Sequence, residues 1–408
     1  MNKNQLHKLL TFPQEKGLLQ NLDLTKNDEE RLISARDEII AVISQGFKDA
    51  RAEVERKGLG YEVPLPRFAM QGSYVYKTLN APAYPPNQQV DIDLGVYMPF
   101  SALGNGEAPS YATENYFGIV TEIMRKHIDA KRKGQWELVT DKDTCIRVQI
   151  SNKTHIDLPL YATPEKVFNQ VKDEHSRALI LNEAEKALFK SMSTFDQEAT
   201  IVERVDPSEI HLAHKKEGWK PSNALAIRDW VKASCKAKGM NNQVRAVCRY
   251  LKAWRDEKWQ SGGGPSSIFL LAFVLRAYKH TSSKHCELLE AVISELPNVF
   301  KSPLLIPCPT PGDRQGKEDL RERVDPDQKA EYLAAFNDLK YCYLKARQNV
   351  SPADSNKELI GIFGDRVPFE PGRIEQNIDS NESKAASTVK RAERRVEPLV
   401  TEDASTSG

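Results

Sequence analysis

Two carboxylates two residues apart are the first feature of this chain that could carry chemistry. Asp91 and Asp93 lie within the segment Val90–Tyr97, where apolar and polar residues alternate as in a strand. Side chains at i and i+2 share one face of a strand, so both carboxylates are expected on the same face. Alone, the pattern is typical of a solvated strand face, but a bound cation would relieve the repulsion between the two charges.

A third carboxylate occurs in a similar setting. Asp157 has apolar neighbours in a second predicted strand. If this strand lies beside the first, three carboxylates converge at a sheet edge. Such a set can hold two Mg²⁺ ions, or Mn²⁺, one activating an attacking hydroxyl and the other neutralising a triphosphate. His155 shares the face of Asp157, and we interpret it as a structural histidine that borders the site.

A Gly-Ser dipeptide precedes the Asp-x-Asp segment. Gly72 allows close backbone approach and Ser73 adds a hydroxyl donor, so the turn could cradle a phosphate with backbone N–H groups. Most Gly-Ser dipeptides are ordinary turns. The order of strand, Gly-Ser, loop and Asp-x-Asp strand is what favours a phosphate-binding loop here.

The elements that must position these residues divide the chain into two parts. The first part alternates helices and strands, beginning with a long helix that we expect to be a spine shared by two lobes. The second part is helical, and the composition from about residue 375 indicates disorder. We predict helices at 25–57, 111–131, 223–237, 244–259, 267–278 and 325–346, and strands at 68–70, 90–97, 145–150 and 155–161.

Basic side chains follow one face of the predicted helix 244–259. Arg245 and Arg255 are expected to be solvated, whereas Lys252 precedes a Gly-rich turn and could reach a phosphate as a mobile point charge. Ser266 and Ser267 stand where the next helix begins. A serine there caps the helix, and a helix N-terminus also favours phosphate.

The bulk composition excludes several classes of protein. The chain has 408 residues, of which 40% are hydrophobic and 28% charged, and a net charge of +1. This balance argues against a protein that coats long nucleic acid. No apolar run approaches the length of a membrane span and no signal peptide is recognisable, so we expect a cytoplasmic protein that does not contact membranes. Six scattered cysteines are expected to be reduced thiols.

The motifs together resemble a known enzyme family. Hydrophobic-Gly-Ser, then Asp-hydrophobic-Asp, then a later single Asp is similar to the signature of polymerase β-like nucleotidyltransferases. The amino-acid sequences of five blocks resemble those of the cyclic GMP-AMP synthase branch of the bacterial CD-NTases. These blocks are residues 71–80, 90–99, 153–162, 247–256 and 263–268.

The resemblance implies an α+β fold with a polymerase β-like nucleotidyltransferase core, built on a mixed sheet, and a helical C-terminal lobe. We place the core with its spine helix at 1–200, the helical nucleotide-binding lobe at 201–374, and a disordered tail at 375–408. The active site would lie in the cleft between the lobes.

The resemblance also implies an activity. Two nucleoside triphosphates, ATP and GTP, would be joined into a cyclic dinucleotide with release of pyrophosphate, and this second messenger would activate an effector in anti-phage defence. It assigns metal binding to Asp91, Asp93 and Asp157. It assigns nucleotide contacts to Gln71, Gly72, Ser73, Tyr74, Val75, Tyr76, Arg147, Ser222, Lys252, Ser266, Ser267 and Asp313.

Alternatives stay open at this point. They are a cyclic trinucleotide or another pair of bases, an RNA-extending nucleotidyltransferase, and a catalytically silent module that senses nucleotides. The near-neutral charge argues against the RNA enzyme, and the three carboxylates argue against the silent module. The terminal Gly408 resembles the attachment point used by conjugation enzymes in some family members, so covalent conjugation at Gly408 is a further expectation.

Overall fold

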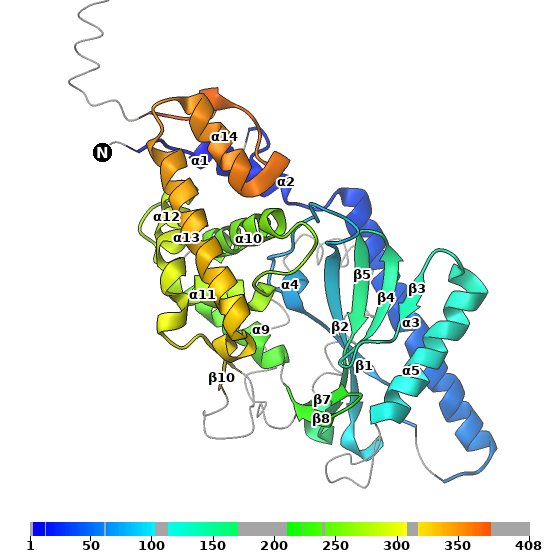
Figure 1. Cartoon of the computed structure of the whole chain (residues 1–408). Helices are drawn as coiled ribbons and strands as arrows, with labels where there is room; N and C mark the ends of the chain where they lie inside the picture. The colour runs from blue at the N-terminus through cyan, green and yellow to red at the C-terminus, as the bar shows by residue number, and fades with distance from the viewer. Residues whose placement is uncertain are drawn as a thin grey trace, which may run out of the picture.

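The computed structural model describes residues 3–12, 14–60, 63–102, 113–169, 210–222, 224–238, 241–307 and 317–376. These residues form a lobe built on a sheet and a lobe built from helices, which lie side by side in Figure 1. Asp313, Gly408 and the predicted tail from residue 377 onward lie outside the described residues. The division of the chain at residue 200 also stays a prediction, because residues 170–209 are not described.

A long central strand, β2 (Val90–Pro99), organises the sheet. Strand β1 (Arg67–Gln71) pairs with it antiparallel. Strands β5 (Thr154–Leu158) and β6 (Leu160–Thr163) run parallel to its two halves, so the sheet is mixed, as predicted. The sheet continues through β4 (Ile146–Ser151) to β3 (Glu137–Val139) on one side, and through β7 (His211–His214) to β8 (Gly218–Pro221) on the other.

The strand register brings the predicted site residues into one row. Asp93 of β2 is opposite Asp157 of β5, and Asp91 is opposite His155. Arg147 of β4 is in turn opposite Asp157. Residues that are paired across neighbouring strands point to the same face. The expectation that the two acidic strands lie beside each other is therefore confirmed.

Two helices cover the sheet on the side away from the helical lobe (Figure 1). Helix α3 (Lys26–Arg56) is capped by Thr25, whose side chain accepts a hydrogen bond from the Asp28 amide. Helix α5 (Thr113–His127) continues into a π-helical turn, η2 (Ile128–Arg132). The buried stripe of α3, including Ile39 and Ile43, packs in the core of the sheet lobe rather than between the lobes. This differs from our expectation of a shared spine.

Helix α10 (Asn241–Lys258) is the centre of the helical lobe. Its predicted inner face, Val244, Val247, Leu251 and Trp254, is buried. The other helices that the described residues form in this lobe are α1 (His7–Leu10), α2 (Leu18–Asn21), α9 (Ala224–Ala237), α11 (Ser267–Ala277), α12 (His285–Glu295), α13 (Pro326–Gln348) and α14 (Pro352–Phe363). They are joined by a two-stranded sheet of β9 (Leu305–Pro307) and β10 (Lys317–Asp319). Short helical turns are α4 (Gly72–Val75), η1 (Phe100–Ala102), η5 (Leu296–Lys301), η6 (Leu320–Arg323), η7 (Gly364–Arg366) and η8 (Pro371–Arg373).

The basic face of α10 is not solvated, so that prediction is wrong. Arg245 is 8% exposed, and the side chain of Arg255 is 18% exposed. The reason is long-range packing: other segments cover α10 on this side as well. The segment between α4 and β2 is hydrogen-bonded to α10. The side-chain amide of Asn80 donates to the Arg249 carbonyl, and the side-chain amide of Gln88 donates to the Asp256 carbonyl.

None of the helices in the described part of the chain combines the length and apolar character needed to cross a bilayer.

Candidate active site

A cleft of about 490 Å³ lies between the two lobes and contains most of the predicted site residues. Its sheet-side wall comes from the end of β1, from α4 and from the start of β2. Its helical wall comes from α9, α10, α11 and the Gly-rich turn between α10 and α11. Predicted residues that line it are Gln71, Gly72, Ser73, Tyr76, Asp91, Asp93, Lys252 and Ser267. The volume falls in the range of small-molecule sites in proteins.

Gly72 occupies a position that other residues would not tolerate. Its φ of 68° lies in the left-handed region, which strongly favours glycine. A Cβ atom at this position would also lie 2.0 Å from Oδ2 of Asp93. Gly72, the glycine of the predicted phosphate loop, and the Asp93 carboxylate are thus in direct contact. Rather than an open loop, Gly72 begins the helical turn α4.

Next to this turn, Gln71 is held by hydrogen bonds to Tyr97 and Tyr161, an arrangement that we call the clamp and that was not predicted from the sequence. The Gln71 side-chain amide donates to the Tyr97 hydroxyl at 2.6 Å, and its carbonyl accepts from the Tyr161 hydroxyl at 3.0 Å. The rings of Tyr97 and Tyr161 are stacked at a centroid distance of 4.7 Å. Gly95 leaves room for the amide, since a Cβ there would meet Gln71 Nε2 at 2.2 Å. The clamp fixes the residue that immediately precedes Gly72.

The carboxylates of Asp91, Asp93 and Asp157, which we call the acidic row, lie close enough to repel one another. Burial, together with the neighbouring carboxylates of Asp91 and Asp157, raises the pKa of Asp93 to about 8. Burial alone would raise the pKa of Asp91 too, but the His155 ring and the Arg147 guanidinium outweigh it and lower that pKa. Crowding of like charges produces this pattern, in which the pKa values of two nearby carboxylates shift in opposite directions.

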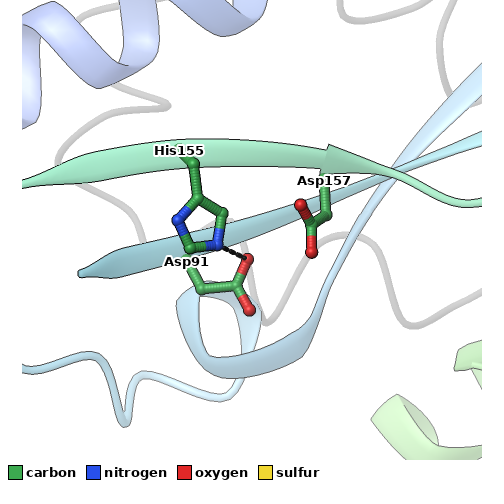
Figure 2. A group of neighbouring side chains, drawn as sticks. All are labelled: Asp91, His155 and Asp157. Carbon is green, nitrogen blue, oxygen red and sulfur yellow. Dashed lines mark ion pairs between the residues drawn. The ribbon is translucent and has the colours of Figure 1, made fainter. Parts of the chain in front are cut away.

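His155 is in direct contact with the acidic row rather than only bordering the site. Figure 2 shows its ring pointing toward Asp91, with Asp157 on the same strand. Its Nε2 lies 3.0 Å from Oδ1 of Asp91, while Nδ1 lies 2.7 Å from Oε1 of Gln89. The period of two in β5 was the signal in the sequence that allowed this placement. Gln89 carried no such signal.

These residues fit a divalent cation. Asp91, His155 and Asp157 offer ligand atoms that all lie within 4.8 Å of one another. Oδ1 of Asp91 and Nε2 of His155 are buried and have no partner with hydrogen-bond geometry among the described residues. Carboxylate oxygens suit Mg²⁺ and Mn²⁺, and an imidazole nitrogen is compatible with Mn²⁺. A cation here would bind these two atoms, which otherwise face only each other at 3.0 Å, and would relieve the repulsion on Asp93.

Arg147 contacts Asp157 rather than the cleft. Its Nε donates to Oδ1 of Asp157 at 2.6 Å, and its Nη2 donates to Oδ2 at 2.7 Å. Such a two-pronged ion pair has strict geometry and is stronger than a bond between neutral groups. The assignment of Arg147 to nucleotide contacts stays a prediction.

Lys252 is a buried cation on the helical wall that reaches the predicted phosphate loop on the sheet-side wall. It is 5% exposed, and its Nζ donates to the Thr78 carbonyl at 2.7 Å and to the Ser73 hydroxyl at 3.3 Å. Burial, with the nearby charge of Arg255, lowers its pKa to about 8. A buried positive charge attracts phosphate more strongly than one in bulk water.

The lowered pKa of Lys252 predicts a pH effect on triphosphate binding. The charged form is lost as the pH rises through about 8, so the affinity for a non-hydrolysable nucleoside triphosphate is expected to fall by about tenfold between pH 7 and pH 9. Lys252→Arg keeps its charge over this range and serves as the control. An equal decline in both proteins, measured by equilibrium titration, would disprove the role of Lys252.

The start of α11 faces the cleft as expected. Ser266 caps the helix, since its hydroxyl accepts from the Phe269 amide. Ser267 lines the cleft and its hydroxyl accepts from Nη1 of Arg255 at 3.0 Å. Asp256 holds the same guanidinium at 2.8 Å. Arg255, predicted to be solvated, instead helps to form the wall of the cleft.

Other predicted contacts do not line the cleft. Val75 is buried in the helical-lobe core, and Tyr74 packs against both cores. Ser222 follows β8, where its amide donates to the Ile210 carbonyl. Asp313 is outside the described residues. Cleft residues that our interpretation of the sequence missed include Thr78, Asn80, Gln89, Trp259 and Arg323.

Two family models match the chain. The nucleotidyltransferase domain of the DncV-like cyclic GMP-AMP synthases matches residues 66–161. The C-terminal domain of cyclic GMP-AMP synthase matches residues 241–375. The first range contains the acidic row and the second contains Lys252 and Ser267.

Curated relatives are cyclic GMP-AMP synthases. The Vibrio cholerae enzyme is 33% identical over 381 residues, covering 88% of this chain and 78% of that protein. An Escherichia coli enzyme is 30% identical over 311 residues, covering 74% of this chain and 68% of that protein. A second one, from Escherichia coli strain TW11681, is 35% identical over 251 residues, covering 60% of this chain and 55% of that protein.

Solved structures have the same fold. A mutant of the Vibrio cholerae di-nucleotide cyclase in complex with ATP, GTP and 5MTHFGLU2 superposes with a TM-score of 0.71 at 25% identity, covering 92% of this chain and 99% of that one. The same enzyme with the linear intermediate 5′ pppA(3′,5′)pG gives a TM-score of 0.70 at 26% identity, covering 93% and 100%. The chain belongs to the family of DncV-like cyclic GMP-AMP synthases, which are bacterial CD-NTase nucleotidyltransferases.

Proposed function

We propose that this enzyme joins ATP and GTP into cyclic GMP-AMP in two successive nucleotidyl transfers, each of which releases pyrophosphate. The observation that carries the proposal is the row of Asp91, Asp93 and Asp157, of which Asp91 and Asp93 line a cleft whose opposite wall supplies Lys252. Further support comes from similar proteins, whose solved structures hold ATP with GTP, or a linear pppApG intermediate.

Each wall of the cleft has a role in this reaction. Mg²⁺ ions, or Mn²⁺, would lower the pKa of the attacking ribose hydroxyl and neutralise the leaving pyrophosphate. Asp91, Asp93 and Asp157 would hold them. Lys252 would place its charge on the triphosphate. The turn at Gly72 and Ser73 would bring backbone and hydroxyl donors close to the same phosphates.

The two-walled cleft favours small substrates. A linear dinucleotide can reorient between the two walls and present its free hydroxyl to the acidic row. Ring closure requires this reorientation. We propose that the cyclic product is a second messenger that activates a separate effector in anti-phage defence. This part of the proposal rests on family membership.

Incubation with labelled nucleotides tests the activity. The protein is given Mg²⁺ and ATP, GTP, CTP and UTP, singly and in pairs, with a label on the α-phosphate. We expect a phosphatase-resistant product with ATP plus GTP. A ladder of longer products on added RNA would instead identify an RNA-extending enzyme. A resistant product of three nucleotides would identify a cyclic trinucleotide synthase, and no product from any pair would overturn the proposal.

A further inference from the structure

Gln71 borders the cleft, yet its side chain is bound by the protein itself. Both ends of its amide are held in the clamp, by the hydroxyls of Tyr97 and Tyr161. All three residues are buried, so water competes weakly for these hydrogen bonds. Burial raises the pKa of the Tyr161 hydroxyl well above its ordinary value, so this group keeps its proton and remains a donor at any working pH.

The clamp and the acidic row share one face of β2. Asp93, Gly95 and Tyr97 stand at alternate positions of this strand and therefore lie on the same side of the sheet. Gln71 is the partner of Asp93 across β1 and β2. A Cβ atom on Gly95 would meet Nε2 of Gln71 at 2.2 Å and Cε2 of Tyr97 at 2.8 Å. The side chain of Gln71 thus runs over Gly95, from the acidic row to the stacked tyrosine rings.

Gln71 also fixes the start of the predicted phosphate loop. It is the N-cap of α4, and its extended backbone leads directly into Gly72. Gly72 lies against Oδ2 of Asp93, and the Ser73 hydroxyl accepts from Nζ of Lys252 at 3.3 Å. A shift of the Gln71 backbone would disturb both contacts, because no residue separates Gln71 from Gly72.

From this arrangement we infer that Gln71, Tyr97 and Tyr161 are positioning residues for triphosphate binding, and that Gln71 acts through its backbone rather than by a side-chain contact with nucleotide. The inference rests on the proposed function, in which the loop at Gly72 and Ser73 approaches the triphosphate. The two hydroxyls hold Gln71, and Gln71 holds the loop against Asp93. Without the clamp, nucleotide binding must also order the loop, which weakens the affinity.

Loss of one hydroxyl tests the inference in an equilibrium measurement. The full chain is titrated with α,β-methylene ATP and Mg²⁺ in a calorimeter, at a temperature at which every variant is folded. Tyr161→Phe should lower the affinity by about tenfold, the effect of one lost hydrogen bond to a charged group. An unchanged or higher affinity would overturn the inference, because an amide released from Tyr161 would be free to bind nucleotide if that were its role.

Tyr116 provides the matched control. Its hydroxyl is also buried in the sheet lobe and donates to a carbonyl of the same strand, that of Val96, at 3.1 Å. Tyr116→Phe removes the same atom and should leave the affinity unchanged. An equal loss of affinity in Tyr116→Phe and Tyr161→Phe would show a general effect of buried hydroxyls on the lobe and would overturn the inference.

A double-mutant cycle tests whether the Tyr161 hydroxyl acts through Gln71. Gln71→Met keeps the length of the side chain and removes its hydrogen bonds to both tyrosines. In this background, Tyr161→Phe should cause no further loss of affinity, because the hydroxyl no longer has an amide to hold. A purely structural role of Tyr161 would give the same loss in both backgrounds, and that result would overturn the inference.

Gly95→Ala disturbs the clamp by a second route, which remains open if Tyr161→Phe does not fold. The new methyl group displaces the Gln71 amide without removing any polar atom, so the affinity should fall by about tenfold or more. An unchanged affinity would contradict the inference. Normal nucleotide binding in the unmodified protein, with all clamp variants unaffected, would count against this inference alone. No binding by the unmodified protein would overturn the proposed function and the inference with it.

Discussion

Asp93→Asn is expected to lower the rate of nucleotidyl transfer by about a thousandfold or more. Each bound cation contributes several kcal/mol of transition-state stabilisation, and about 1.4 kcal/mol corresponds to a tenfold change in rate. Asp93 lies at the centre of the acidic row, between Gly72 and Asp157. Asparagine has nearly the same shape but no negative charge. Pyrophosphate release from ATP plus GTP measures the loss.

The same substitution should not unfold the protein. The folded-state pKa of Asp93 is raised to about 8 from an ordinary value of 3.8, so without metal its ionisation opposes folding increasingly as the pH rises from 3.8 to 8. Removing the carboxylate relieves this opposition at pH 7. The melting temperature of the metal-free variant should therefore equal or exceed that of the unmodified protein.

The matched control for Asp93→Asn is Asp129→Asn. Asp129 is exposed, lies on η2 and is remote from the cleft. It loses the same charge and should retain full activity. If Asp93→Asn retained more than about a tenth of the activity while Asp129→Asn behaved normally, the assignment of Asp93 to the metal site would be wrong.

Gly72→Ala is expected to reduce the efficiency of the enzyme by about a hundredfold or more. The left-handed backbone costs a non-glycine residue roughly 1–2 kcal/mol. In addition, the new methyl group would lie 2.0 Å from Oδ2 of Asp93, so the carboxylate or the turn must move. Displacement of catalytic groups by about 1 Å can cost about a hundredfold in rate. Steady-state kinetics with both nucleotides measure the effect.

A glycine on a helix surface provides the control for this change. Gly118 is exposed on α5, and a Cβ there meets no atom within 4 Å. Gly118→Ala should therefore leave activity unchanged and stabilise the fold by up to about 1 kcal/mol, the helix-propensity difference. Equal activity of the two alanine variants would show that the contact between Gly72 and Asp93 has no functional importance.

The parts of the site that depend on the two-residue repeat of a strand, or on the residue type at a helix start, could be predicted from the sequence. Asp91 and Asp93 share a face because strands repeat every two residues, and the same rule placed His155 beside Asp157. The cap at Ser266 followed from the residue type at a helix start. The fold class, which the family resemblance implied, was confirmed: alternating helices and strands give way to helices in the second half of the chain.

Features that depend on distant parts of the chain could not be predicted. The N-terminal leucines Leu6 and Leu9 pack in the core of the helical lobe, although they precede the sheet lobe in the chain. The buried state of Arg245 depends on the segments that cover α10, and no pattern within the helix reveals them. The clamp of Tyr97 and Tyr161 on Gln71 likewise joins three strands through side chains. These contacts arise from tertiary packing, which overrides the structural preferences of the local sequence.

The stoichiometry of pyrophosphate release tests the central claim most directly. The purified chain is incubated with ATP, GTP and Mg²⁺, and both pyrophosphate and the mass of the dinucleotide product are quantified in the same sample. Two transfers at one acidic row predict two pyrophosphates for each dinucleotide, and a product mass that leaves no 5′ triphosphate. One pyrophosphate for each linear dinucleotide that retains its triphosphate, with no further conversion, would contradict the account.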